Sequence, residues 1–382
     1  MDNITVETCT AAADLPAEDW RRVAPAGDPF LNREFLTIIE THGAAGRACG
    51  WVPSHLVARG SDGGIRALLP LYLRFNSHGD FIHDWSWAGA YRQLGRNYYP
   101  KLFSGLPHTP VTGPRFLVAP GASEPWAIEA LSRAAIALAE DGGLSSWHIA
   151  FPAAAQLEAL AARELIVSHN VQFHWQDQDY GDFDGFLAAF AAEKRRKVRA
   201  ERRKTRECGL RLETLHGDEI APAEWPALHR LYTATFEKFG NLPVFSADCF
   251  AALARALGRR MVLFVARDGK QPVAVAICYR SDEALFGRYW GCSGNYPNLH
   301  FELCFYQGID YCLTNGLQRF EPGAGGEHKL ARGFVPTTVR SAHWIADPAM
   351  RKLIARHLVA QRDAYAGYRD ETSGHLPFRN AG

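Results

Sequence analysis

Two stretches of the chain show the same order of apolar and polar positions. Around residues 55–74 an apolar run meets the turn SDGG, and a second apolar run follows it. Around residues 261–280 the order recurs as MVLFVARDGKQPVAVAICYR. Apolar runs on both sides of an Asp-Gly turn predict a β-hairpin in each stretch. Because the two hairpins lie close to half the chain apart, the pattern indicates a tandem duplication of one structural unit.

The segments around the hairpins predict matching elements in both halves. They are helices over 29–43, 224–240 and 247–258, third strands over 81–89 and 285–291, and helix–strand pairs over 125–151 and 301–323. This order predicts an α/β fold in which each half is a mixed central sheet with helices on both faces. The predicted domains are residues 1–178 and 179–382.

Composition fits an ordinary globular protein of two or three domains, with 382 residues, 47% of them hydrophobic and 22% charged. No apolar run approaches the roughly 18 residues of a membrane span. The first residues, MDNITVETCTAAADLP, lack the charged and apolar regions of a signal peptide. Eight cysteines without a CxxC pair indicate reduced thiols. A cytoplasmic location is therefore expected.

Lys and Arg (42) nearly balance Asp and Glu (41), so any surface for polyanions must be local. One segment is strongly basic: EKRRKVRAERRKTRE holds nine Lys or Arg and three Glu residues. It follows apolar positions at helical spacing, which predicts a helix over 186–208 near the junction of the halves, with Gly209 after its end. Mutual repulsion on such a helix favours a polyanion partner, although a solvated face is the alternative. The candidate polyanion-binding residues are Lys194, Arg195, Arg196, Arg199, Arg202, Arg203 and Arg206.

The densest polar cluster is RFEPGAGGEHKLARGFVP, residues 319–336. Its glycines permit close approach of a ligand to the backbone, and acid, base and cationic side chains follow within six residues. The spacing fits neither a phosphate-binding P-loop nor a dinucleotide fingerprint. A surface turn is the alternative interpretation. Glu327 and His328 are candidate catalytic residues, and Glu321, Lys329 and Arg332 are candidates for binding substrate.

A second cluster, GRYWGCSGNYPNLHFELC, joins a predicted central strand to a helix. Arg288 and Trp290 end the strand and are candidates for binding substrate. His300 and Glu302 open the helix and are candidate catalytic residues, or alternatively ordinary first-turn residues.

An aromatic stretch in the first half offers a third group: Asp84, Trp85, Tyr98, Tyr99 and Lys101 could form a substrate wall or plain core. No His, Cys or Asp grouping has the spacing of zinc ligands, and neither GxSxG nor HExxH occurs. The sequence thus predicts neither a metal ion nor a cofactor.

Several long motifs together resemble one known family. They include PFLNREFL, HDWSWAGAY, KRRKVRAERR, GRYWG, LHFELCFYQGID and FEPGAGGEHKLARGFVP. The combination resembles the FemAB-like predicted N-acyltransferases, which are similar to the Fem peptidoglycan aminoacyltransferases of the GNAT superfamily. The resemblance implies two tandem GNAT-like domains. It also implies that the basic segment after the first domain contacts a polyanionic ligand.

The implied reaction is amide-bond formation between an activated acyl donor and an amine of a peptide or small molecule. Such an aminolysis needs a base for the amine proton and a donor for the oxyanion. Ordinary GNAT enzymes bind acyl-CoA through a Q/R-x-x-G-x-G/A turn, whereas this chain has GCSGNYPNL at that place. Aminoacyl-tRNA is therefore the favoured donor. An acyl-CoA-dependent N-acyltransferase and a non-catalytic protein that binds nucleic acid or a cell-wall precursor remain as alternatives.

Overall fold

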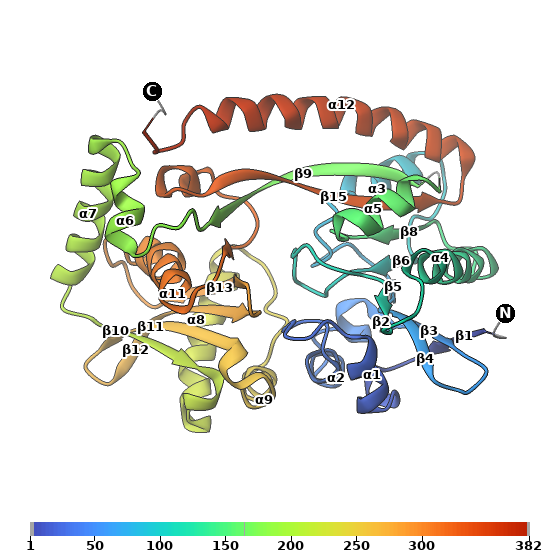
Figure 1. Ribbon diagram of the computed structural model, residues 1–382, viewed down its shortest axis with the longest axis horizontal. Coiled ribbons are helices and arrows are strands. Elements are labelled where there is room, and N and C mark those ends of the chain that lie inside the picture. Colours follow the sequence, from blue (N-terminus) through green and yellow to red (C-terminus); the bar gives the residue numbers. More distant parts are fainter. Residues whose placement is uncertain (1–3, 164, 380–382) are drawn as a thin grey trace. The chain divides into compact units, whose positions relative to one another are not determined.

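A computed structural model describes residues 4–163 and 165–379 (Figure 1). By its internal contacts the chain forms two compact units. The first is Met1–Asn170 with Thr338–Ala366, and the second is Val171–Thr337 with Gly367–Gly382. The sequence-based division at residue 178 lies close to the first crossing between the units. It does not include the second crossing, through which residues 338–366 pack with the first unit.

The first unit contains two sheets. An antiparallel sheet has the order β1 (Thr5–Cys9), β3 (His55–Arg59), β4 (Ile65–Leu69) and β7 (Leu117–Val118). A mixed sheet has the order β2 (Trp51–Pro53), β5 (Tyr72–Arg74), β6 (Lys101–Ser104), β8 (Ser146–Ile149) and β15 (Val335–Ile345), in which only β6 and β8 run parallel. The helices are α1 (Ala17–Val23), α2 (Arg33–Thr41), α3 (Trp85–Gln93), α4 (Glu124–Asp141), α5 (Ala154–Ala161) and, for its first part, α12 (Pro348–Ser373).

The predicted first hairpin, β3–β4, is confirmed, but the strand expected over 81–89 is wrong. Most of that segment belongs to α3. Its buried positions Asp84, Trp87, Ala88 and Tyr91 recur at steps of three, one and three, which is helical spacing. The aromatic residues suggested a strand, but their period is that of a helix.

The second unit is built on one mixed sheet. Its order is β10 (Arg211–His216), β11 (Met261–Asp268), β12 (Gln271–Arg280), β13 (Ala284–Cys292), β14 (Arg319–Glu321) and β9 (Ile166–Gln176). The first four strands are antiparallel, and β13 and β14 run parallel. The predicted hairpin β11–β12 and the third strand β13 are confirmed. The helices are α6 (Phe183–Ala188), α7 (Ala192–Glu207), α8 (Trp225–Lys238), α9 (Ala247–Leu257), α10 (Leu299–Phe301) and α11 (Gln307–Asn315).

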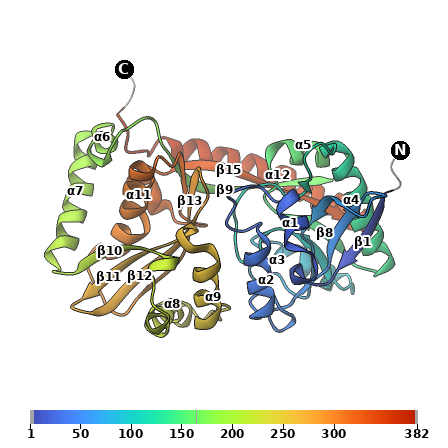
Figure 2. The ribbon, with the colours of Figure 1, turned by 60° about the horizontal axis from the view of Figure 1, so that its bottom comes forward.

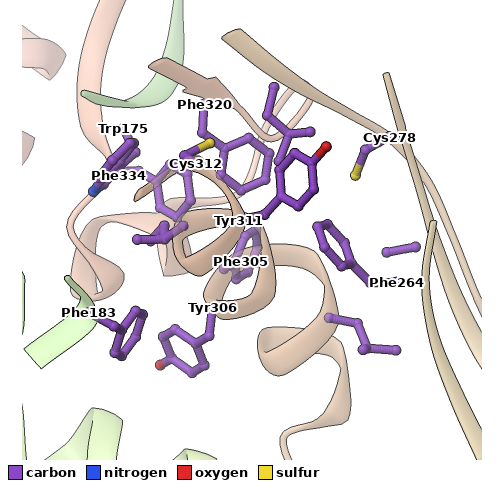
Figure 3. Close-up of a cluster of buried hydrophobic side chains, with 14 of the residues drawn as sticks. Trp175, Phe183, Phe264, Cys278, Phe305, Tyr306, Tyr311, Cys312, Phe320 and Phe334 are labelled. Atoms are coloured by element: carbon purple, nitrogen blue, oxygen red, sulfur yellow. The ribbon is translucent and has the colours of Figure 1, made fainter. Parts of the chain in front are cut away.

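Helices cover both faces of this sheet. Every residue from Met261 to Ala266 of β11 is buried, as expected for a strand enclosed on both sides. Figure 2 shows α8 and α9 on one face and α11 on the other. On the α11 face, Phe264 and Cys278 pack in one core cluster with Phe305 and Tyr311 (Figure 3). The expected fold class, an α/β chain with helix-covered mixed sheets, is confirmed.

Two glycines and a helix break define the local geometry of this unit. A Cβ on Gly291 of β13 would lie 1.9 Å from the carbonyl oxygen of Leu231, so glycine lets α8 approach the strand. Gly209 has φ +71° directly after α7, as predicted for the residue that ends this helix. The single helix expected over 186–208 is wrong, because Ala191 has ψ 145° and separates α6 from α7.

Candidate active site

β13 and β14, the two parallel strands of the second unit, diverge where the candidate residues lie. β13 pairs with β14 only from Ala284 to Phe286, opposite Arg319–Glu321, while β13 itself continues to Cys292. Opposite β12, Ile277 pairs with Tyr289 and Cys278 with Gly287, so Arg288 is the extra residue of a β-bulge. Bulges re-aim side chains and are common beside active sites.

A cavity of about 440 Å³ lies at this divergence. Its walls come from the bulged strand β13, the neighbouring strand β12, the helical segment after β13, the Gly-rich turn after β14 and the side chain of Phe239. Five of the residues singled out from the sequence line it: Arg288, Trp290, His300, His328 and Lys329. Sequence reasoning did not single out Phe239, Cys304, Phe305 or Pro322, which also line the cavity and resemble ordinary core or loop positions in the sequence.

Lys329 is the most unusual of these side chains. It is only 4% exposed, and its ammonium donates to the carbonyl oxygens of Gly323 (2.7 Å) and Ala324 (3.4 Å). Burial, together with the neighbouring Arg288 guanidinium, lowers the pKa of Lys329 to about 8. Roughly a tenth of this amine is therefore neutral at pH 7 and can accept a proton, far more than for an ordinary lysine.

Aromatic side chains surround the two histidines of the cavity. The His300 ring lies 5.2 Å from Trp290 and 5.8 Å from His328, and His328 lies 5.5 Å from Phe305. Burial lowers the pKa of His300 to about 4, and it also lowers the pKa of His328. Both imidazoles are therefore mainly neutral at pH 7. Gly326, with φ +91°, leaves room for this packing, since a Cβ there would lie 2.7 Å from His328 Cε1.

Four further candidates of the second unit make contacts of their own. Glu302 is buried and accepts from Arg202 (3.0 Å). Glu321 is buried and pairs with Arg319 (2.8 Å). Glu327 is exposed and accepts from the Tyr368 hydroxyl (2.8 Å). Arg332 is buried and pairs with Glu201 (2.8 Å). These four charged side chains, which the sequence suggested for contact with substrate, therefore have partners within the protein.

The aromatic cluster of the first unit is a buried ionic network. The Lys101 ammonium donates to Asp80 (2.8 Å), to Ser77 (2.8 Å) and to Asp84, while the Tyr98 hydroxyl donates to Asp84 (2.5 Å). From Tyr98 the hydrogen bonds continue through His148 to His343 and from there to Ser168. Tyr99 bonds to Ser77 (2.7 Å), whereas Trp85 is 51% exposed. Lys101 and Tyr98 thus both donate to one carboxylate oxygen of Asp84 in the interior.

The basic helix α7 presents an outer and an inner face. Arg202 lies on the inner face, where it contacts Glu302, Asp310 (2.9 Å) and the Phe183 ring (4.3 Å). Arg195 is half-buried, and Arg199 pairs with Asp184 at the surface (3.1 Å). The exposed cations are Lys194, Arg196, Lys197, Arg199, Arg203, Lys204 and Arg206.

Two solved structures with TM-scores above 0.5 show the same fold, and a third is similar with a lower score. FemX has a TM-score of 0.52 at 12% identity, covering 92% of this chain and 100% of that chain. The C-terminal domain of a putative lysylphosphatidylglycerol synthetase from Agrobacterium fabrum has a TM-score of 0.52 at 11% identity, covering 90% and 96%. A tandem GNAT protein from the clavulanic acid biosynthesis pathway has a TM-score of 0.49 at 14% identity, covering 91% and 99%. No curated protein sequence is similar enough to count as a relative.

The fold consists of two α/β units whose sheets are covered by helices, and FemX shares this fold. The chain belongs to the FemAB-like family, described as peptidoglycan biosynthesis/recognition, which matches residues 11–380. The resemblance read from the sequence motifs is confirmed, and with it the acyltransferase class. Within the described ranges no three His, Cys, Asp or Glu side chains are grouped to hold a metal ion. No helix of those ranges is long and apolar enough to cross a bilayer.

Proposed function

We propose that the second unit transfers an aminoacyl group from aminoacyl-tRNA to an amine of a peptidoglycan-precursor peptide or a similar small molecule. The observation that supports this most is the buried Lys329 on the wall of the 440 Å³ cavity. The amine hydrogen-bonds to carbonyl oxygens and has a pKa lowered to about 8 by burial. A general base whose pKa is near the working pH suits proton removal from an attacking amine.

In the proposed reaction Lys329 acts first as a base and then as an acid. The acceptor nitrogen attacks the ester carbonyl of the donor, a C–N bond forms, and Lys329 takes the proton that the nitrogen loses. The C–O bond to the ribose then breaks, and protonated Lys329 returns the proton to the departing ribose oxygen. His328 and His300 are neutral hydrogen-bonding groups on the same wall, and Arg288 supplies positive charge for the oxyanion. Holding both substrates together supplies most of the acceleration, since the ester is already activated.

A second cavity supports a reaction of two substrates. It has a volume of about 330 Å³ and shares Phe239, Trp290 and His300 with the first cavity. The shared residues form a wall that two ligands can approach from two sides. The donor's acyl end and the acceptor amine would meet beside Trp290 and His300.

The outer face of α7 supports a nucleic-acid donor. Its seven exposed cations lie on the same unit as the cavity. Phosphate contacts of this kind supply most of the non-specific affinity for nucleic acid. A donor of this class and eight free cysteines also support a cytoplasmic location.

The donor can be tested directly. The purified protein is incubated with tRNA charged with radiolabelled amino acids, or with radiolabelled acyl-CoA, and with a stem peptide that carries a free lysine amine. We expect the label to move from tRNA to the peptide, and ribonuclease treatment of the donor to abolish the transfer. Transfer from acyl-CoA alone would identify the acyl-CoA-dependent alternative. A protein that binds tRNA or the peptide but transfers from neither donor would be the non-catalytic alternative.

A further inference from the structure

The inner face of α7 contacts two of the segments that carry the cavity's polar side chains, those of His300 and of Lys329. Val198, Glu201, Arg202 and Thr205 recur at helical spacing, and all except Arg202 are buried. Two of these four side chains are charged, although buried charges are costly unless they are paired. Each of the two makes an ion pair with a different segment of the cavity wall.

Glu201 connects α7 to the segment of Lys329. Its carboxylate accepts two hydrogen bonds from the Arg332 guanidinium, at 2.8 and 3.0 Å, and one from the Tyr306 hydroxyl. Arg332 in turn donates to the carbonyl oxygen of His328 (2.6 Å) and lies 3.4 Å from the centroid of the Phe301 ring. Arg332 ends the 3-10 helix Glu327–Arg332, which also carries Lys329. Arg332 therefore links the basic helix directly to the backbone beside the cavity.

Arg202 connects α7 to the segment of His300. It donates to both carboxylate oxygens of Glu302, and Glu302 begins a π-helical turn, Glu302–Tyr306, two residues after His300. Such turns widen a helix by one residue and are frequent at functional sites. Gln307 also donates to Glu302 (2.9 Å), so this carboxylate is fully engaged.

We propose that Glu201 is a positioning residue that ties the polyanion-binding helix α7 to the cavity. Through Arg332 it holds the short helix of His328 and Lys329 in place, so the donor bound on the outer face of α7 meets an organised cavity on the inner side. The hydrogen bonds between Glu201 and Arg332 are charge-assisted, and bonds of this kind are strong and directional enough to position a segment. This inference deepens the proposed function and rests on it.

The test compares two substitutions on the same helix. Glu201→Gln keeps the side-chain volume and removes the charge that holds Arg332. Glu207→Gln is the matched control, because Glu207 is 64% exposed and pairs only with Arg203 at 3.6 Å. We expect Glu201→Gln to lower kcat about 10- to 100-fold, as a small misplacement of catalytic groups does. The Kd for uncharged tRNA should remain that of the parent, and Glu207→Gln should change neither value.

A second readout does not depend on the transfer reaction. Acetic anhydride is used to label the protein at several pH values, and the modified fraction of Lys329 is measured by peptide mass spectrometry. In the parent and in Glu207→Gln, labelling should rise with a midpoint near pH 8. In Glu201→Gln the midpoint should move toward the ordinary value for lysine, because the amine is no longer held in its buried position. If transfer is absent in every variant but the midpoint still moves, the positioning role stands and the proposed function fails.

Folding is controlled separately. Should Glu201→Gln be unstable in a thermal melt, Arg332→Lys replaces it, since lysine keeps the charge but cannot bind Glu201 and the His328 carbonyl together. A folded Glu201→Gln or Arg332→Lys protein with the parent's kcat and labelling midpoint would overturn the proposal.

Discussion

At the scale of single residues, the burial of Lys329 lowers the stability of the folded protein. Its pKa in the folded protein, lowered to about 8 by burial, lies below the ordinary 10.5. At pH 7, below both values, the charged form is held where burial disfavours it, which costs on the order of 3 kcal/mol. The cost disappears as the pH rises through 8 toward 10.5. A side chain kept at such a cost is expected to serve the reaction.

The first prediction follows from that cost. Lys329→Met removes the buried charge and keeps much of the volume, so we expect the melting temperature at pH 7 to stay equal or rise. Acyl transfer should fall about 10²–10⁴-fold, the usual effect of losing a general base. A thermal melt and a transfer assay on the same preparation measure both. A variant that melts well below the parent while each folded molecule keeps full activity would make Lys329 a structural residue.

The buried network of the first unit leads to the opposite prediction for Lys101. Lys101→Met leaves Asp80 and Asp84 buried without their cation, which should cost about 3–5 kcal/mol at pH 7. Lys352→Met, at an exposed position of α12 in the same unit, is the matched control and should cost little. Thermal melts of the three proteins measure the difference. Equal melting temperatures would show that the network does not stabilise this unit.

The pH dependence of this effect has a definite sign. Burial raises the pKa of Asp84, but the Lys101 ammonium and His148 outweigh it and hold that pKa below the ordinary 3.8. A carboxylate with a lowered pKa contributes stability above its unfolded value and loses that contribution as the pH falls. The gap in melting temperature between the parent and Lys101→Met should therefore narrow from pH 7 to pH 3.

Single residues also show which parts of the candidate site can be predicted from the sequence. The local cluster around Lys329 is visible in the sequence, because three glycines and four charged or basic residues lie within ten positions. The partners of those charges are not visible. Glu201 and Arg332 are 131 residues apart, and Arg202 and Glu302 are 100 apart. Such pairs depend on tertiary structure. The sequence alone therefore suggests Glu302 as a catalytic residue and Arg332 as a substrate-binding residue, whereas in the structure both pair with the basic helix.

At the scale of elements, the two faces of α7 predict different effects of arginine substitutions. Arg196, Arg199, Arg203 and Arg206 point outward at steps of three, four and three. Replacing all four by alanine should weaken tRNA binding and flatten its dependence on salt, because fewer counterions are released. Filter binding between about 50 and 200 mM salt measures the slope. An unchanged slope would identify the outer face as a solvated surface.

Arg202 serves as the contrast within this element. Arg202→Ala leaves Glu302 buried without its main partner, so it should lower the melting temperature more than the four outward substitutions do. The sequence grouped Arg202 with the outward arginines because helical spacing alone does not say which face meets the rest of the protein. The missed break at Ala191 has a similar origin, since apolar and basic runs follow each other without a glycine or proline to mark it.

At the scale of the whole molecule, the duplicated α/β plan is readable from the sequence because the hairpins carry strong local patterns. The assignment of residues 338–366 to the first unit is not readable in this way. A helical pattern does not name the sheet or the core that the helix covers, so the sequence does not show which unit α12 packs with. An alternating strand pattern likewise does not specify that β15 pairs with β8.

In the proposed reaction, Lys329 of the second unit removes the proton from the acceptor amine. The most direct measurement is the single-turnover rate of aminoacyl transfer from tRNA to a stem peptide between pH 6 and pH 10, for the parent and for Lys329→Met. We predict that the parent's rate rises with pH and levels off above about 8, where Lys329 is neutral. The Lys329→Met rate should be low and should lack this step. A variant that keeps the parent's rate and its step near pH 8 would contradict the assignment.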